Sequence, residues 1–243
     1  MLVFKLIMKI KKLVLFHAVL IFGFAYNTYA KSLTKNERNF VDESEIQLAL
    51  SEGEIANRDF EDLIKPKKLL NNLRNGGYVI YFRHAQTFKD YADQADPNLD
   101  LTDCSTQRKL SFKGIQDARD IGQVFTNKKI PIGKIITSQY CRSWKTANYA
   151  FGRVDQKDSR LNFLPYEDYT SDHVDLMIKN VTPILSKRPK EGKNTIIVGH
   201  DDIFESATGI YPDPQGIAYI IKPLEKGKFQ LISNILPQEW AKL

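Results

Sequence analysis

The chain has 243 residues, of which 42% are hydrophobic and 26% are charged, values typical of a soluble globular domain with one core. It holds 35 basic and 29 acidic residues, and four of the basic residues are lysines within residues 1–12. Without those four lysines the charge is nearly balanced, so the net charge does not indicate a nucleic-acid partner.

Residues 1–30 have the pattern of a secretory signal peptide. The basic segment precedes an apolar run over 13–24, and Thr28 and Ala30 are the small residues of a cleavage site. The run is shorter than the roughly 20 residues of a membrane span. We expect cleavage after Ala30 and a periplasmic or secreted mature protein without membrane contact. The alternatives are an uncleaved N-terminal anchor and a start at Met8.

Residues 31–62 are polar, show no sustained hydrophobic period, and are expected to form an extension before a domain over 63–243. In that domain, apolar runs alternate with segments of helical spacing. Strands are predicted over 78–82, 134–138, 194–199, 218–222 and 229–233, and helices over 66–75, after Ser111, and over 143–151, 172–185 and 203–208. This alternation indicates an α/β fold, a three-layer α/β/α sandwich with a mainly parallel central sheet.

Two of the four histidines are candidates for chemistry. His17 lies in the predicted signal peptide, and His173 lies in a polar stretch and is expected on the surface. His84 and His200 each follow a buried strand directly. Because chemistry in parallel α/β sheets gathers at the carboxyl ends of the strands, these two imidazoles are expected to meet there.

Cleavage of a phosphate ester needs the side chains that accompany these histidines. A neutral imidazole can attack phosphorus and form a phosphohistidine that water then cleaves. Arginine binds phosphoryl oxygens through two parallel hydrogen bonds, and Arg83 and Arg142 stand near the predicted strand ends. A second imidazole, protonated, can bind another oxygen, and a carboxylic acid such as Asp201 can protonate the leaving group.

Four motifs occur in a fixed order. They are Arg83–Thr87 (Arg-His-Ala-Gln-Thr), Leu110–Ala118, which contains Leu-Ser-x-x-Gly, Ile136–Ala147, which contains Ser-x-x-x-Arg-x-x-x-Thr-Ala, and Val198–Asp201 (Val-Gly-His-Asp). Together they resemble the motifs of the histidine phosphatase superfamily, which includes cofactor-dependent phosphoglycerate mutase. The resemblance spans about residues 77–222 and implies a phosphoglycerate mutase-like fold.

The resemblance also implies roles. His84 would be the nucleophile, and Arg83, Arg142 and His200 would form the phosphate pocket. No metal and no other cofactor takes part in such a reaction. This chain has Ala85 where the motif usually has glycine, and alanine is the smallest side chain that can replace it.

The proton donor has more than one candidate. Members with a carboxylate directly after the second histidine use that residue, which is Asp201 here. Mutase-like members use an acid from the segment after the arginine helix, where Glu167 and Asp168 lie. We expect Asp201 to be the donor, and Asp202 to cap the helix that follows.

Two cysteines, Cys104 and Cys141, are present, and in an oxidising compartment such a pair is more often bridged than free. A bridge would close a loop of about 37 residues and stabilise the fold by roughly 3–4 kcal/mol. It would also tie the 85–107 loop to the helix that presents Arg142. Two roles remain open, a stiffener of the pocket rim and a staple remote from it.

The predicted function is that of a metal-independent phosphomonoesterase with a small-molecule phosphomonoester substrate. The alternatives are an inactive binding protein on the same fold, and a metal-dependent phosphohydrolase with His84, His200, Asp201 and Asp202 as ligands, which the nearby arginines disfavour. Export disfavours a mutase and a phosphohistidine-protein phosphatase, and favours envelope sugar phosphates or phosphate scavenging. No feature of the sequence indicates an oligomeric state.

Overall fold

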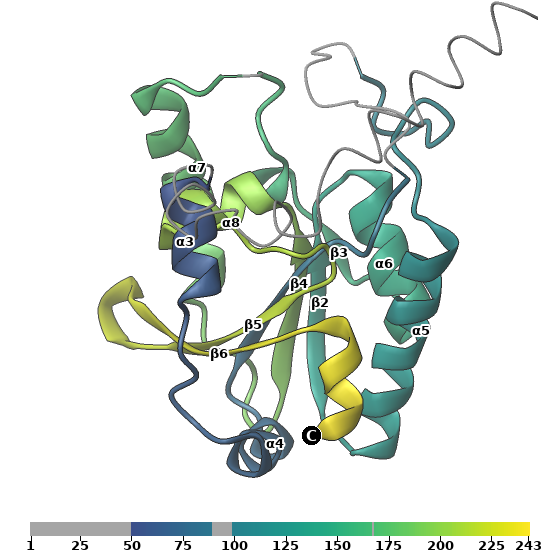
Figure 1. Cartoon of the computed structure of the whole chain (residues 1–243), viewed down its shortest axis with the longest axis vertical. Coiled ribbons are helices and arrows are strands. Elements are labelled where there is room, and N and C mark those ends of the chain that lie inside the picture. Colours follow the sequence, from purple (N-terminus) through teal and green to yellow (C-terminus); the bar gives the residue numbers. More distant parts are fainter. Residues whose placement is uncertain (1–49, 89–98, 167) are drawn as a thin grey trace, which may run out of the picture. The chain divides into compact units, whose positions relative to one another are not determined.

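A computed structural model describes residues 50–88, 99–166 and 168–243. The helices are α3 (Glu52–Arg58), α4 (Pro66–Asn75), α5 (Phe112–Asn127), α6 (Cys141–Phe151), α7 (Ser171–Leu185) and α8 (Asp201–Thr208), with 3-10 helices η2 (Ser159–Leu161), η3 (Glu225–Gly227) and η4 (Pro237–Lys242). The strands are β1 (Val79–Arg83), β2 (Ile132–Thr137), β3 (Gln156–Lys157), β4 (Asn194–Gly199), β5 (Ala218–Pro223) and β6 (Phe229–Ile235) (Figure 1). The predicted signal peptide, residues 1–30, and most of the predicted extension lie outside the described residues.

The strands form one six-stranded sheet in the order β3-β2-β4-β1-β5-β6. The first four strands in this order pair in parallel, whereas β5 is antiparallel to β1 and β6 is antiparallel to β5. The predicted mainly parallel sheet is therefore confirmed. Only the hairpin of β5 and β6 departs from it, because the few residues between these two strands cannot form a parallel crossover.

Helices cover both faces of the sheet, as predicted for a three-layer sandwich (Figure 1). Successive residues of a strand point to opposite faces. Ile80 and Phe82 of β1 face the layer of α4, α5, α6 and η4, whereas Val79 and Tyr81 face α7 and α8. Each such fully buried side chain contributes roughly 1.5–3 kcal/mol relative to exposure, which fixes the register of the central strand.

The element bounds agree with the predicted ones to within a few residues, and two differences matter for the site. The last predicted helix begins at Asp201 instead of Ile203, with His200 at its N-cap. Asp202 therefore lies inside the first turn, and the expectation that it caps this helix is wrong. The other difference is α3, which the polar pattern of residues 31–62 did not predict.

Residues 50–62 pack onto the sheet. Leu50–Leu243 form one compact unit. The α3 helix begins with a capping box between Ser51 and Glu54, and the Asn57 side chain accepts a hydrogen bond of 2.6 Å from the Tyr219 hydroxyl. Leu63 donates its amide to the carbonyl of Ile232 at 2.9 Å. This segment is thus held by specific hydrogen bonds to β5 and β6.

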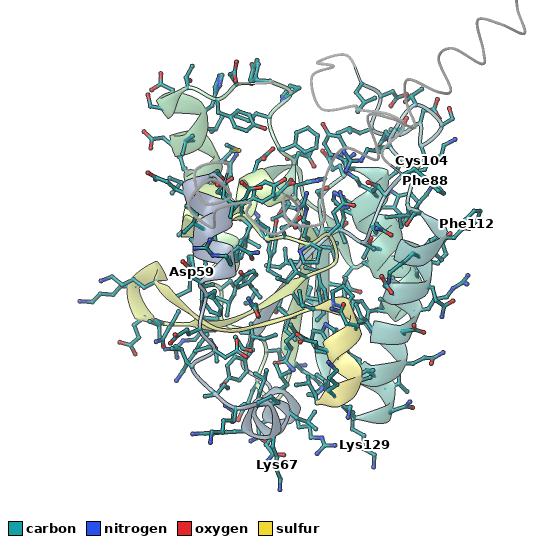
Figure 2. The ribbon with its side chains drawn as sticks, viewed as in Figure 1. Asp59, Lys67, Phe88, Cys104, Phe112 and Lys129 are labelled. Carbon is teal, nitrogen blue, oxygen red and sulfur yellow. A yellow bond between two sulfur atoms is a disulfide. The ribbon has the colours of Figure 1, made fainter. Side chains whose placement is uncertain are left out.

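None of the helices in the described part of the chain is long and apolar enough to cross a bilayer. Two labelled side chains mark the opposite ends of the unit. Lys67 of α4 lies at the end where β1 begins, and Cys104 lies at the opposite end (Figure 2). Cys104 is therefore at the end to which the parallel strands deliver their carboxyl-terminal residues.

Candidate functional site

The carboxyl ends of β1 and β4 bring His84 and His200 together. The two strands pair in parallel with Arg83 opposite Gly199, and the amide of His84 donates to the carbonyl of Gly199 at 3.0 Å. The two rings lie 5.5 Å apart at an angle of 65°. Both side chains are buried, so the predicted meeting of the two imidazoles is found in the structure.

The tautomer of His84 follows from its neighbours. Nδ1 lies 2.9 Å from the carbonyl oxygen of Ala85, which can only accept, so Nδ1 carries the hydrogen. Nε2 then has the lone pair, and it accepts a hydrogen bond of 3.2 Å from Nε of Arg142. Burial, followed by the charges of Arg142 and Arg83, lowers the pKa of His84 well below its ordinary value. The imidazole is therefore neutral, the form that a nucleophile requires.

His200 is held by two serines. Ser138 Oγ lies 2.7 Å from Nε2 of His200 and accepts the amide hydrogen of Tyr140 at 3.2 Å, and Ser143 Oγ lies 3.4 Å from the same nitrogen. The Ser138 hydroxyl can donate to Nε2, and in that arrangement the hydrogen of the neutral ring resides on Nδ1. That Nδ1 is buried and has no hydrogen-bond partner among the described residues.

The expected protonated form of the second imidazole concerns the site with an anion bound. Burial, followed by the charge of Arg142, lowers the pKa of His200 well below its ordinary value. In the pocket without an anion, His200 is therefore neutral. With the Ser138 hydroxyl donating to Nε2, the neutral ring can donate a hydrogen bond through Nδ1 without an added proton.

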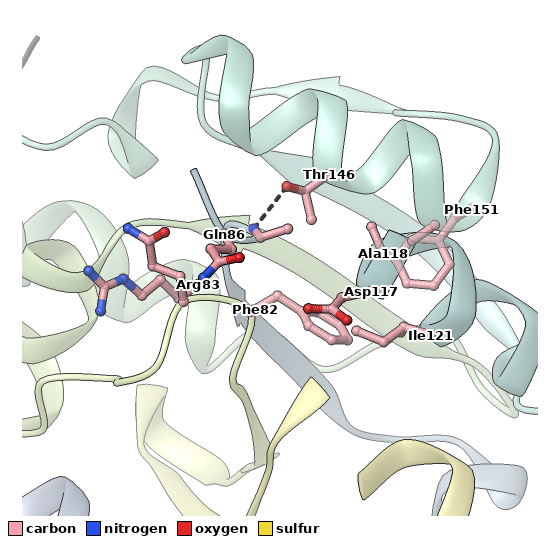
Figure 3. Close-up of a pocket in the computed structure, with 12 residues that line it drawn as sticks. Phe82, Arg83, Gln86, Asp117, Ala118, Ile121, Thr146 and Phe151 are labelled. Carbon is pink, nitrogen blue, oxygen red and sulfur yellow. Dashed lines mark hydrogen bonds between the residues drawn. The ribbon is translucent and has the colours of Figure 1, made fainter. Parts of the chain in front are cut away.

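Arg142 is presented by the first turn of α6. Its guanidinium lies over two aromatic rings, 4.9 Å from the Tyr140 centroid and 5.2 Å from that of Phe163. Thr146 lies one turn further and donates its hydroxyl to the Arg142 carbonyl at 2.7 Å. The same hydroxyl oxygen accepts the amide of Ala85 at 3.0 Å (Figure 3). One threonine thus joins the arginine helix to the turn that carries His84.

Arg83 points toward the segment that follows α8. It donates to the carbonyl of Pro212 at 2.9 Å, to Asp213 at 3.0 Å and to the Tyr211 hydroxyl at 3.2 Å, and it forms an ion pair with Asp201. Its Nε is buried without a partner among the described residues. Arg83 therefore keeps one donor that no protein group of the described chain uses.

The candidate acids lie in different places. Asp201 accepts a hydrogen bond of 2.9 Å from Tyr211 and pairs with Arg83. Asp202 contacts the Tyr169 hydroxyl at 3.0 Å. Asp168 is exposed, and Glu167 lies outside the described residues. Of the candidate acids whose positions are known, Asp201 is the one that pairs with a predicted phosphate-binding residue, Arg83.

Arg108 also lies at the site and was not predicted from the sequence. Its Nε donates to Thr87 Oγ1 at 2.7 Å, and its charge adds to those of Arg142 and Arg83 in lowering the pKa of His84, after burial. A third arginine therefore adds its positive charge near the two imidazoles. Its position two residues before Leu110, at the start of the second motif, was the available signal.

The segment before Arg108 is tied to the arginine helix. Cys104 and Cys141 form the predicted disulfide. Gln107 is buried, and its Oε1 accepts the amide of Cys141 at 2.8 Å. Both links end at the residue directly before Arg142. The disulfide therefore lies at the edge of the site, the position that a stiffener of the pocket rim requires.

Two glycines of the motifs permit close approach to the site. A Cβ on Gly114 would overlap the backbone of Gln86, so the start of α5 can pack against the turn after His84 only with glycine there. A Cβ on Gly199 would overlap the hydroxyl of Tyr81, which donates to the carbonyl of His200 at 2.7 Å. In both motifs, therefore, the space at this position is too small for any side chain larger than that of glycine.

A small apolar cavity lies behind the turn of residues 83–86, lined by β1, α5 and α6 (Figure 3). Its free volume of about 10 Å³ is at most the space of one water molecule. Neither imidazole lines it. The cavity is therefore a packing space behind the nucleophile turn and is not where a substrate would bind.

The described residues contain no group of three or more His, Cys, Asp and Glu side chains arranged to hold a metal ion. Of the four ligands considered for a metal-dependent reaction, the two carboxylates contact different partners. Asp201 faces Arg83, and Asp202 faces Tyr169. The arrangement therefore does not bring these carboxylates together with the two imidazoles.

No family model and no curated protein matches the sequence. Among solved structures, the protein histidine phosphatase SixA in complex with tungstate matches with a TM-score of 0.48 and 14% identity, covering 67% of this chain and 98% of that chain. A phosphoserine phosphatase from Entamoeba histolytica matches with a TM-score of 0.47 and 14% identity, covering 66% of this chain and 98% of that chain. A putative α-ribazole-5′-phosphate phosphatase from Escherichia coli matches with a TM-score of 0.49 and 12% identity, covering 67% of this chain and 98% of that chain. These neighbours are phosphatases, and at TM-scores below 0.5 they assign no activity to this chain.

Proposed function

We propose that this protein is a metal-independent phosphomonoesterase that works through a phosphohistidine on His84. The observation that carries the proposal is a buried nucleophile surrounded by unused donors. His84 is neutral with its lone pair on Nε2, and Arg83 Nε and His200 Nδ1 are buried nitrogens without protein partners in the described chain. In the tautomer in which Ser138 donates to His200 Nε2, both are donors. A phosphoryl oxygen would supply the missing acceptor to each donor.

The reaction has two steps. In the first, Nε2 of His84 attacks phosphorus, the P–N bond forms, and the bond from phosphorus to the leaving oxygen breaks. In the second, water attacks phosphorus and the P–N bond breaks, which releases inorganic phosphate and restores the neutral imidazole. Arg142 donates to Nε2 before substrate binds. We infer that it moves this hydrogen bond to a phosphoryl oxygen, which frees the lone pair.

Arg83, Arg142 and His200 are the proposed phosphate-binding residues, and Arg108 joins them. The three guanidinium groups offset the charge of a phosphate dianion. The same positive charges disfavour a metal cation between the imidazoles. This supports a reaction in which the arginines and His200 stabilise the charge without a metal ion.

Asp201 is the proposed general acid of the first step and general base of the second. It pairs with Arg83 while the site is empty. A bound phosphate would compete for this guanidinium and free the carboxyl group to take up a proton and pass it to the leaving oxygen. Hydrogen bonds of catalytic groups often reach their working geometry only with substrate bound.

Export to an oxidising compartment is part of the proposal. The signal-like pattern of residues 1–30 and the Cys104–Cys141 disulfide support it, because disulfides persist in such compartments. Small phosphomonoesters of the cell envelope, or mixed phosphomonoesters as a source of phosphate, are then the substrate class that the location favours.

The test is hydrolysis of p-nitrophenyl phosphate in EDTA by the mature chain and by two matched variants. His84→Gln should lose about 10³-fold or more in kcat and should form no acid-labile phosphoenzyme. His173→Gln should keep both, because His173 lies in the first turn of α7, where glutamine can form the same capping box with Thr170. Turnover by His84→Gln at the level of the unmodified protein would overturn the proposal.

A further inference from the structure

The Tyr169 hydroxyl contacts two oxygen atoms at once. Its oxygen lies 3.0 Å from the carbonyl oxygen of Leu164 and 3.0 Å from Oδ2 of Asp202. A tyrosine hydroxyl has one hydrogen to donate, a carbonyl oxygen can only accept, and an ionised carboxylate can only accept. With Asp202 ionised, two acceptors would compete for one hydrogen.

A protonated Asp202 resolves this competition. Its own hydroxyl can donate to the oxygen of Tyr169, and Tyr169 can donate to Leu164. Burial raises the pKa of Tyr169, so its hydroxyl keeps the hydrogen that this chain of hydrogen bonds needs. Both contacts are then satisfied in one direction, from Asp202 through Tyr169 to the backbone of Leu164.

The charges around Asp202 favour the same protonation state. Burial, followed by the charge of Asp201, raises the pKa of Asp202 to about 6. Glu205 on the same helix also faces Asp202, and burial, then Asp202, raises its pKa. A hydrogen bond donated by Tyr169 lowers this pKa, as do the charges of Arg83 from β1 and Arg142 from α6. Burial and the charge of Asp201 outweigh these three effects.

The chain of hydrogen bonds ends next to the site. Leu164 follows Phe163 directly, and the ring of Phe163 lies 4.8 Å from that of His200 and 4.4 Å from that of Tyr140. The guanidinium of Arg142 lies 5.2 Å from the same ring. The backbone at Leu164 therefore sets where Phe163 meets two residues of the phosphate pocket.

We propose that Asp202 is a positioning residue that acts in its protonated form, by holding Tyr169 and Leu164 so that Phe163 stays packed against His200 and Arg142. This deepens the proposed function and rests on it. Above the pH at which Asp202 loses its proton, one of the two hydrogen bonds weakens. The aromatic wall of the pocket then loosens, and catalysis slows.

The experiment compares the unmodified protein with Asp202→Asn and Tyr169→Phe. An asparagine amide donates a hydrogen bond to Tyr169 at every pH and so imitates the protonated acid. With p-nitrophenyl phosphate, kcat/KM of the unmodified protein should fall about fivefold as pH rises through about 6, the effect of one lost hydrogen bond. Asp202→Asn should match its acid-side value and lack this fall, and Tyr169→Phe should be low at both ends of the range.

Two outcomes would overturn the proposal. If Asp202→Asn loses activity as severely as a catalytic acid would, by about 10²-fold or more, then Asp202 transfers a proton itself. If its pH profile equals that of the unmodified protein, the Asp202 proton has no role.

Infrared difference spectra between the unmodified protein and Asp202→Asn give a readout that does not need turnover. The carbonyl band of a protonated carboxylic acid should be present near pH 5 and absent near pH 8, on either side of the pKa of about 6. Absence of that band at the acid end overturns the proposal even if His84 is the nucleophile. Its presence without phosphatase activity would instead place the failure in the proposed function.

Discussion

The Nδ1 atom of His84 lies 2.9 Å from the carbonyl oxygen of Ala85, its own neighbour in the chain. This contact fixes the tautomer, because only a protonated Nδ1 can meet a carbonyl at that distance. The lone pair of Nε2 is consequently directed to the side where Arg142 donates to it. The orientation of the proposed nucleophile thus depends on backbone geometry and needs no separate orienting carboxylate.

Activity should persist on the acid side of pH 6.5. Burial, followed by the charges of Arg142 and Arg83, holds the pKa of His84 well below the ordinary 6.5. The imidazole is neutral at every pH above that lowered pKa, so its lone pair stays available in mildly acidic buffer. The pH dependence of kcat/KM, together with the ¹⁵N chemical shifts of His84, measures this. A titration of His84 centred at or above pH 6.5 would contradict it.

Thr146→Val should weaken both the fold and the site. The substitution keeps the shape of the side chain but removes the acceptor of the Ala85 amide and the donor to the Arg142 carbonyl. A buried amide without a partner costs about 1–3 kcal/mol, measurable by urea unfolding. The turn of His84 also loses its link to α6, so kcat should fall about tenfold or more.

Thr126→Val is the matched control for that variant. Thr126 is also a helical threonine, and its hydroxyl donates only to the carbonyl of Gly122 one turn earlier. We expect a loss of unfolding free energy below about 1 kcal/mol and an unchanged kcat. Equal losses of kcat in the two variants would show that Thr146 has no specific connection to the site.

The sequence was sufficient to predict five of the six strands and their layers, because these depend on hydrophobic period; the two-residue β3 was not predicted. The apolar runs of β1 and β4 are buried on both faces, and such runs identify the centre of a parallel sheet. It did not predict α3, whose stability comes from contacts such as that of Asn57 with Tyr219, between residues far apart in the chain. It also did not place the start of α8, since two adjacent aspartates are equally good cap residues by type.

Within the site, motif residues were predictable and their supports were not. His84, Arg83, Arg142 and His200 stand in recognisable patterns at strand and helix ends. Ser138, by contrast, shows its role only when the structure places its hydroxyl 2.7 Å from His200. The neutral state of His200 was unpredictable for the same reason, since burial lowers its pKa first and burial is a property of the fold.

Asp201→Asn should slow the hydrolysis of phosphate esters, and the loss of kcat should be larger for esters with a poorer leaving group. A weakly acidic alcohol needs a proton as it departs, whereas p-nitrophenolate leaves without one. We expect kcat for an alkyl phosphate to fall about 10²–10³-fold and kcat for p-nitrophenyl phosphate to fall much less. The measurement is kcat for both substrates at one pH.

Asp213→Asn tests whether loss of the pairing to Arg83 explains the effect of Asp201→Asn. Asp213 also pairs with Arg83, at 3.0 Å, but its side chain is 60% exposed, and exposed ion pairs contribute little. This variant should leave kcat for both substrates nearly unchanged. If it reproduces the leaving-group dependence of Asp201→Asn, the dependence comes from Arg83 and not from a proton on Asp201.

Replacement of Cys104 and Cys141 by serine should lower both stability and substrate affinity. The bridge joins residues separated by 37 positions, for which chain entropy predicts roughly 3–4 kcal/mol, or a fall in Tm of roughly 10 °C in a domain of this size. The freed segment also carries Arg108, so KM should rise. Dithiothreitol should produce the same changes in the unmodified protein and none in the double variant. If KM is unchanged in both the double variant and the dithiothreitol-treated unmodified protein, the bridge stabilises the fold without shaping the pocket.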